Sequence, residues 1–127
     1  MSKRIIHTPS APAPIGPYSQ AVKTGNLLFV SGQVALVPGT NEFVNADVAQ
    51  ETRQVMQNIN AILEQAGMGF GNIVKTTIFL SSMDLFAQVN EVYATFFQND
   101  FPARETVAVL GLPKNANVEI SVIASGE

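Results

Sequence analysis

Two segments of the chain carry apolar side chains at consecutive positions, and they limit the folds open to it more than any other feature. Residues 27–34 and 73–80 are rich in branched and aromatic residues, which predicts a strand for each. Successive side chains of a strand point to opposite faces of a sheet. The unbroken apolar run at residues 27–30 therefore predicts a strand that is buried on both faces.

Two further segments have the periodicity of amphipathic helices. Within residues 48–66 apolar side chains recur at spacings of three and four, Asp47 with Gln50 resembles a capping box, and Gly67 stands where a C-cap is expected. A second helix is predicted to begin at Asp84. Its apolar face comprises Phe86, Val89, Tyr93, Phe96 and Phe97.

Shorter strand-like segments complete a ββαβαββ order, with one short strand before it. Turn-forming residues at Gly25-Asn26 and around Pro113 predict two hairpins, the second between the last two strands. The whole chain, residues 1–127, is expected to form one α+β domain with a single-layer sheet of five or six strands. The shorter segments are residues 4–8, 20–23, 106–112 and 118–124.

The number of helices has a consequence for assembly. Two helices, each about 10 Å wide, cover only one face of a five- or six-stranded sheet whose strands are about 4.8 Å apart. The other face would then expose more apolar surface than monomers in water tolerate. A homo-oligomer is predicted, and the alternative is a sheet that curls tightly enough to cover itself, although closure usually takes about eight strands.

Charge and composition exclude several function classes. The net charge of −3, the pI near 5.0 and the lack of a lysine or arginine run argue against nucleic acid as the primary partner. The chain has no cysteine, which excludes disulfides, thiolate nucleophiles and thiolate metal ligands. Its single histidine, His7, excludes an imidazole metal site and the paired histidines that ribonucleases commonly use.

Neither a cofactor nor a targeting segment is predicted. The sequence contains no glycine-rich phosphate loop and no dinucleotide-binding fingerprint, so we expect a metal-free protein without a cofactor. The N-terminal residues lack the apolar stretch of a secretory signal, and no apolar run is long enough to span a membrane. A cytoplasmic protein that does not bind membranes is expected.

Two charged residues in the last third of the chain are candidates for chemistry. Glu119 lies in an apolar strand. Because its neighbours Val118 and Ile120 point to the other face of that strand, Glu119 could instead be a carboxylate that is exposed to solvent and has no role in chemistry. Arg104 follows a Phe-Pro-Ala segment. Its alternative role is a structural ion pair with Glu105, although neighbours on a strand point to opposite faces and pair poorly.

Three motifs in order along the chain resemble the RidA (YjgF) family of reactive-intermediate deaminases, which also has members described as L-PSP endoribonucleases. They are PIGPYSQA at residues 14–21, FVSGQ at 29–33, and FPAR at 101–104 with LP at 112–113 and VEI at 118–120. The resemblance spans nearly the whole chain.

This resemblance implies a chorismate-mutase-like α+β fold that assembles as a homotrimer, with clefts between subunits for small 2-imino and 2-oxo carboxylic acids. Arg104 would hold the substrate carboxylate, because a guanidinium offers a carboxylate two parallel hydrogen bonds. Glu119 would orient and activate water. The residues that would line the pocket are Tyr18, Ser31, Gly32, Asn90 and Thr106.

The implied activity is that of a 2-iminobutanoate/2-iminopropanoate deaminase. Such a hydrolase converts enamine and imine acids, for example 2-aminoacrylate and 2-iminopropanoate, to 2-oxo acids and ammonia. Two alternatives stay open: a non-catalytic trimer that binds a 2-oxo acid as a regulator, and an endoribonuclease or translation inhibitor.

Two features near Arg104, Thr106 and the segment 98–100, depart from the family pattern, and Glu105 lies between Arg104 and Thr106. Thr106 stands where members often have cysteine, Glu105 is expected to add a charge near the pocket, and the segment 98–100 is short and is expected to reshape one wall of the cleft. If the last two strands form a hairpin, Glu119 lies opposite about Leu110, about 20 Å along the strand from Arg104. We therefore expect these two residues to meet only between different subunits.

Overall fold

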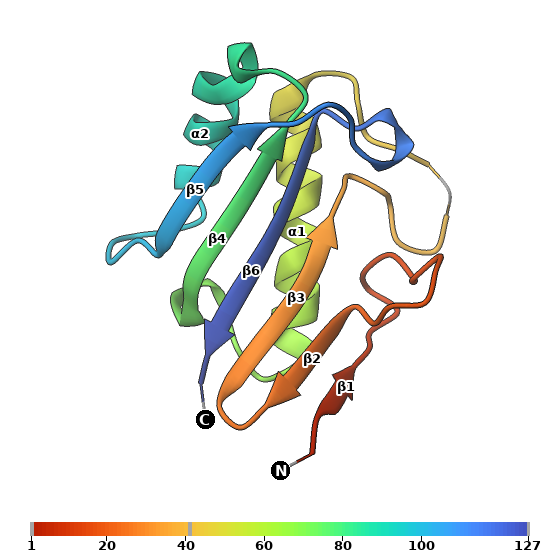
Figure 1. Ribbon diagram of the computed structural model, residues 1–127, viewed down its shortest axis with the longest axis vertical. Helices are drawn as coiled ribbons and strands as arrows, with labels where there is room; N and C mark the ends of the chain where they lie inside the picture. Colours follow the sequence, from red (N-terminus) through yellow and green to blue (C-terminus); the bar gives the residue numbers. More distant parts are fainter. Residues whose placement is uncertain (1, 41, 127) are drawn as a thin grey trace.

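The computed structural model describes residues 2–40 and 42–126, and it shows one layer of β-sheet with two helices packed on one face (Figure 1). This arrangement confirms the predicted α+β class, with a mixed sheet of six strands in the described residues. The strands are β1 (Arg4–Ile6), β2 (Ala21–Thr24), β3 (Leu27–Gln33), β4 (Ile73–Leu80), β5 (Ala103–Ala108) and β6 (Val118–Ser125). The helices are α1 (Val48–Gln65) and α2 (Phe86–Ala94), and the 3₁₀ turns are η1 (Phe70–Asn72), η2 (Met83–Leu85) and η3 (Pro113–Asn115).

The order of strands in the sheet is β1-β2-β3-β6-β4-β5, with β4 and β5 parallel and all other neighbours antiparallel. The predicted hairpin of the last two strands is therefore wrong, because β6 lies between β3 and β4. The segment that joins β5 to β6 crosses the end of β4 (Figure 1), where the Ser81 N–H donates to the Asn117 carbonyl (2.9 Å). Glu119 consequently pairs with Phe79 of β4 and not with Leu110.

Burial explains why β6 is central and β5 lies at the edge. Every second side chain of β6 is buried, and these side chains need α1 above them and a strand on either side. In β5 no side chain is fully buried, which suits an edge strand. β5 also begins at Ala103 and not at residue 106, because it pairs with β4 from Lys75 onward.

The first helix begins and ends close to the predicted residues. Asp47 is the N-cap, and its carboxylate accepts a hydrogen bond from the Gln50 N–H (2.8 Å). At the other end the N–H groups of Gly67 and Met68 donate to the carbonyls of two residues in the last turn, and Gly67 has the positive φ (75°) that such a Schellman ending requires. Among the described residues no helix has both the length and the apolar character needed to cross a membrane.

The second helix differs from the prediction at both ends. Its N-cap is Leu85, and not Asp84, and no side-chain hydrogen bond caps it. Ser82 instead caps the preceding turn η2, where its hydroxyl accepts from the Asp84 N–H (3.1 Å). The helix ends before Phe96 and Phe97, whose rings pack against Phe70 with centroid distances of 5.3 and 5.8 Å.

The hydrophobic core lies between the helices and one face of the sheet, and the other face is open. The prediction that residues 27–30 are buried on both faces is wrong for a single chain. Leu28 and Val30 are buried toward the helices, whereas Leu27 and Phe29 are 40% and 42% exposed. The exposed apolar side chains of the open face include Ile5, Leu27, Phe29 and Val107.

Candidate functional site

Arg104, on the edge strand β5, is held by side chains of α2. Its Nη1 donates a hydrogen bond to Asn90 Oδ1 (2.7 Å), and its guanidinium carbon lies 5.2 Å from the ring centroid of Tyr93 and 5.7 Å from that of Phe86. Guanidinium groups stack favourably on aromatic rings. Within the described part of the chain no hydrogen bond engages Nε or Nη2 of Arg104, so this edge of the guanidinium is available to an anion.

This guanidinium lies in the wall of a cavity of about 410 Å³, a size typical of small-molecule sites. The Tyr93 hydroxyl, at the base of the site, donates to Thr76 Oγ1 (2.9 Å). Burial raises the pKa of Tyr93, against smaller opposing effects of the Thr76 hydrogen bond and the Arg104 charge. A fixed positive charge between aromatic rings suits a small anion with an apolar part. The cavity is lined by Asn90, Tyr93, Ala94, Phe101, Pro102 and Arg104.

Thr106 lies on the same face of β5 as Arg104, two residues further along. Its Oγ1 is buried and makes no hydrogen bond with any described residue. Buried hydroxyl groups in folded proteins nearly always have a partner. In the single chain Thr106 does not line the Arg104 cavity.

Glu105 points away from the Arg104 cavity. It lies between Arg104 and Thr106 on the strand and so faces the open side of the sheet, where it forms an ion pair with Lys75 (3.3 Å). The expectation that Glu105 adds a charge near the pocket is therefore wrong. Alternation along the strand also excludes the ion pair between Arg104 and Glu105 that was the alternative interpretation.

Glu119 leaves β6 on the open face, opposite to the face that Arg104 occupies. It is partly buried in a second cavity of about 370 Å³. Burial raises the pKa of Glu119 above the usual value of a glutamate, because the charged form loses hydration. This carboxyl group therefore keeps its proton up to a higher pH than a glutamate in water does. The cavity is lined by Ile15, Tyr18, Ser31, Gly32, Pro113 and Glu119.

A β-bulge in β3 shapes this second cavity. The pairing of β3 with β6 shifts within residues 30–33, and such irregularities turn side chains in new directions. The Ser31 hydroxyl donates to the Ser19 carbonyl (2.6 Å) and so ties the strand to the preceding loop. A Cβ atom on Gly32 would lie 2.7 Å from Glu119 Oε2. Glycine at this position therefore leaves the space that the carboxylate occupies.

The proline-rich loop that carries Tyr18 is held by a buried glutamine that sequence analysis did not assign to the site. Gln20 Oε1 accepts from the Thr8 N–H (2.7 Å), and Nε2 donates to the carbonyls of Thr8, Ala11 and Pro12. These bonds replace the regular backbone pairing that the loop lacks. The position of Gln20 inside the PIGPYSQA motif is the signal that could have identified it.

The structure thus places the predicted residues in two groups on opposite faces of the sheet. Strand β4 lies between them: Thr76 pairs with Arg104 on one side, and Phe79 pairs with Glu119 on the other. Two strand spacings and an offset along β4 separate the Cα atoms of Arg104 and Glu119 by about 14 Å. One group comprises Asn90, Arg104 and Thr106, and the other comprises Tyr18, Ser31, Gly32 and Glu119.

Sequence analysis also missed several residues that lie beside Arg104 or Glu119, among them Phe86, Tyr93 and Pro113. It assigned Phe86 and Tyr93 to the apolar face of a helix and Pro113 to a turn, whereas the structure places Phe86 and Tyr93 against Arg104 and Pro113 beside Glu119. The available signal was Asn90, which is four residues after Phe86 and three before Tyr93. Residues at these spacings share one face of a helix.

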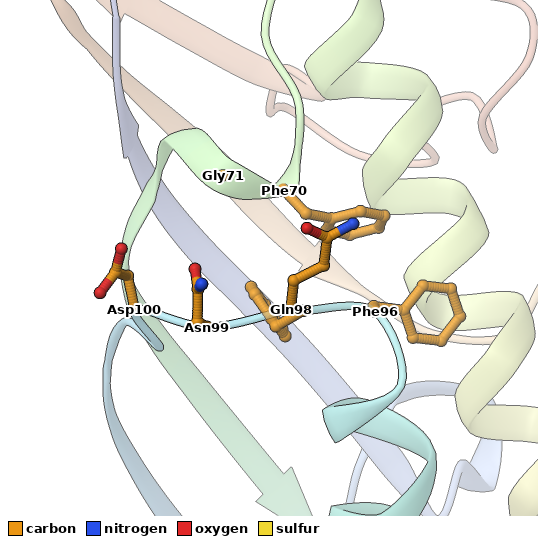
Figure 2. A pocket seen from close by; sticks show the side chains of 7 residues that line it. Phe70, Gly71, Phe96, Gln98, Asn99 and Asp100 are labelled. Atoms are coloured by element: carbon orange, nitrogen blue, oxygen red, sulfur yellow. The ribbon is translucent and has the colours of Figure 1, made fainter.

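A third cavity, also of about 410 Å³, lies beyond the C-terminal end of α2 and is lined by Phe70, Gly71 and residues 96–100 (Figure 2). Figure 2 shows the Gln98 side chain extending toward Phe70. None of the lining residues is a lysine or arginine, so this cavity offers no positive charge to a carboxylate. The segment 98–100 was predicted to reshape a wall of the substrate cleft, but in the single chain it lines this separate cavity.

Comparisons with known proteins show similarity in sequence and in fold over nearly the whole chain. The family model for Endoribonuclease L-PSP matches residues 8–125. A RutC family protein of Pyrococcus horikoshii is 50% identical over 125 residues, which are 98% of this chain and 99% of that protein. A 2-iminobutanoate/2-iminopropanoate deaminase of Dermatophagoides farinae is 48% identical over 121 residues, 95% of this chain and 94% of that protein. The crystal structure of E. coli TdcF with bound serine matches with a TM-score of 0.93 and 42% identity, covering 98% of this chain and 99% of TdcF.

Proposed function

Because the chain belongs to the Endoribonuclease L-PSP family, to which the RidA deaminases also belong, we propose that it hydrolyses small 2-imino acids and their enamine tautomers to 2-oxo acids and ammonia. The observation that carries this proposal is the Arg104 guanidinium, held by Asn90 and two aromatic rings in the wall of a cavity. Two findings among similar proteins support it: the name of the Dermatophagoides relative and the serine bound to TdcF, which is a small carboxylic acid.

The first task of the site is to fix the carboxyl end of the substrate. Nε and Nη2 of Arg104 form the flat edge that matches a carboxylate with two hydrogen bonds, while Asn90 occupies Nη1. A substrate fixed at its carboxylate presents the neighbouring imine carbon in one orientation, which lowers the entropic part of the barrier. The orphaned Thr106 hydroxyl supplies a further hydrogen bond to the same ligand.

The second task is to deliver water. A protonated imine is already electrophilic, so the reaction needs a placed water and a base. Glu119 accepts a proton as the water oxygen bonds to the imine carbon, and it returns that proton to the nitrogen. It then accepts the hydroxyl proton as the C=O double bond forms, the C–N bond breaks and ammonia leaves. One water is consumed and one 2-oxo acid is formed. An enamine such as 2-aminoacrylate first tautomerises to the imine.

The proposed reaction requires assembly, because Arg104 and Glu119 of one chain cannot both contact the same ligand. Arg104 and Glu119 lie on opposite faces of the sheet, with β4 between their strands. The open face exposes apolar side chains on its outer and central strands, and a homotrimer would cover them. In the proposed trimer, each site combines Arg104, Asn90 and Thr106 of one subunit with Glu119 and the Tyr18 loop of its neighbour.

The test is ammonia release from freshly generated 2-aminoacrylate, measured above the uncatalysed rate. Arg104→Ala removes the carboxylate anchor, so we expect kcat/KM to fall at least about 100-fold. Arg53→Ala is the matched control, because Arg53 is an exposed arginine on α1, and it should leave the rate unchanged.

The outcomes of this test separate the alternatives. A protein that binds a 2-oxo acid but releases no ammonia above the uncatalysed rate is a regulatory binder and not an enzyme. Cleavage of RNA that survives Arg104→Ala would support the ribonuclease alternative. The first result contradicts the proposed deaminase, and the second contradicts it where the wild type also releases no ammonia above the uncatalysed rate.

A further inference from the structure

Glu51, in the first turn of α1, is a fully buried carboxylate whose two oxygens bind one residue outside the helix. Oε2 accepts a hydrogen bond from the Asn117 N–H (2.8 Å), and Oε1 accepts from Asn117 Nδ2 (3.0 Å). Asn117 directly precedes β6, and Glu119 is two residues further along. The carboxylate therefore connects the start of the longest helix to the start of the strand that carries the proposed base.

Asn117 is also held by the end of β4. The Ser81 N–H donates to the Asn117 carbonyl (2.9 Å), and the Ser81 hydroxyl donates to Asn117 Oδ1 (3.0 Å). All four polar groups of Asn117 are thus engaged, two by Glu51 and two by Ser81. Since α1 and β4 both pack in the core, the residue at the start of β6 is fixed from two directions.

The segment just before Asn117 has an unfavourable backbone that needs such support. Lys114 and Asn115 have φ values of 58° and 57°. This is the left-handed backbone conformation, which residues other than glycine rarely adopt. Residues of this kind persist where the surrounding structure holds them. Pro113, directly before them, lines the cavity of Glu119, so one strained turn joins a wall of that cavity to its carboxylate.

We propose that Glu51 is a positioning residue for Glu119: by holding Asn117, it fixes the strained turn and the start of β6, and thereby the place of the Glu119 carboxylate. The inference rests on the proposed function, in which Glu119 is the base. Glu51 does not contact the substrate in this account, and it lies away from the Arg104 cavity. Its loss should therefore act on the chemical step and leave carboxylate binding intact.

The variant Glu51→Gln tests this inference with a minimal change of shape. An amide has one acceptor oxygen, so one of the two Asn117 donors loses its partner. We expect kcat for ammonia release to fall at least about tenfold, because small displacements of a reacting group have large effects on rate. KM should change less than about twofold, because Arg104 of the neighbouring subunit fixes the substrate carboxylate in the proposed trimer. Glu64→Gln makes the same change at an exposed position of α1 and should match the wild type.

A second variant covers the case in which Glu51→Gln does not fold. Asn117→Ala keeps the backbone N–H but removes Nδ2 and Oδ1, so it should lower kcat in the same way. Where both variants fold, the double variant should lower kcat no further than the stronger single one, because both act through one contact. Wild-type kcat in a folded Glu51→Gln protein, or additive effects in the double variant, would overturn the inference.

A titration of the Glu119 carboxyl carbon by NMR keeps the two proposals distinguishable. If Glu119→Gln leaves the rate of ammonia release unchanged, or if the wild type releases no ammonia, the proposed function has failed. The titration then decides the positioning role alone. Glu51→Gln should move the pKa of Glu119 toward its usual value as the cavity loosens, and Glu64→Gln should not. An unchanged titration in Glu51→Gln contradicts the positioning role whatever the activity.

Discussion

Arg104 and Glu119 leave the same sheet on opposite faces, from the two strands that flank β4. The guanidinium faces α2, where Asn90 and two aromatic rings hold it, and the carboxylate faces the open side. In the proposed mechanism both groups act on one small acid, so the site is complete only where a second subunit covers the open face. In this proposal the exposed apolar residues of the open face form the contact with the second subunit, and that contact completes the site.

The raised pKa of Glu119 predicts the acidic side of the pH profile. Burial raises this pKa, so the carboxyl stays protonated up to a higher pH than a glutamate in water, whose pKa is about 4.3. A base is active when deprotonated, and the enzymatic rate should therefore fall as the pH is lowered through the raised value. Rates of ammonia release at several pH values, less the uncatalysed rate, measure this. An acidic limb that persists in Glu119→Gln would contradict the assignment.

Gly32→Ala should lower kcat through a steric effect on the base. The added Cβ would lie 2.7 Å from Glu119 Oε2, so the carboxylate must move, and we expect kcat to fall at least about tenfold. Gly71→Ala is the control, since a Cβ there meets nothing within 4 Å. Equal rates for the two variants, with both correctly folded, would show that the contact is unimportant.

Thr106→Val should separate stability from binding. The Oγ1 of Thr106 is buried without a partner in the described structure, so replacing the hydroxyl by a methyl group should stabilise the ligand-free protein by about 1 kcal/mol. KM should rise, because the ligand loses a hydrogen bond. Urea unfolding and steady-state rates measure the two effects. Thr52→Val is the control, since Thr52 donates to Val48 (2.7 Å) and its replacement should not stabilise the protein. Destabilisation by Thr106→Val would show that the hydroxyl has a partner in the assembled protein.

Local patterns of the sequence predicted the elements of the fold but not their pairing. Asp47 and Gly67 bound α1 as expected, because capping depends on neighbours in the chain. The order of β5 and β6 in the sheet depends instead on which of the two strands buries more apolar surface under α1. The segment around Pro113 resembled a hairpin turn because the long crossover between β5 and β6 contains the same kinds of residue as such a turn. The open face was foreseen from the number of helices, although the apolar run in β3 was taken as buried.

The candidate site shows the same division. The motifs and the resemblance supplied Arg104, Glu119 and their neighbours. The structure places Asn90 and Arg104 in the wall of one cavity and Tyr18, Ser31, Gly32 and Glu119 in the wall of another, whereas Thr106 lines neither. The motifs could not supply Glu51, whose partner Asn117 lies far along the chain. Contacts of this kind leave no periodic signal, since they are made by loops that the tertiary fold brings together.

The most direct test of shared sites is to mix two inactive variants. Arg104→Ala lacks the anchor and Glu119→Gln lacks the base, so each alone should be inactive. If every site takes Arg104 from one subunit and Glu119 from its neighbour, each mixed trimer has one intact site, and equal mixing by co-refolding should restore about one quarter of the wild-type rate. Sites built within single chains would recover nothing, because no chain in the mixture carries both residues. Mixed assemblies, verified by two affinity tags, that show no activity above that of the separate variants would contradict the account.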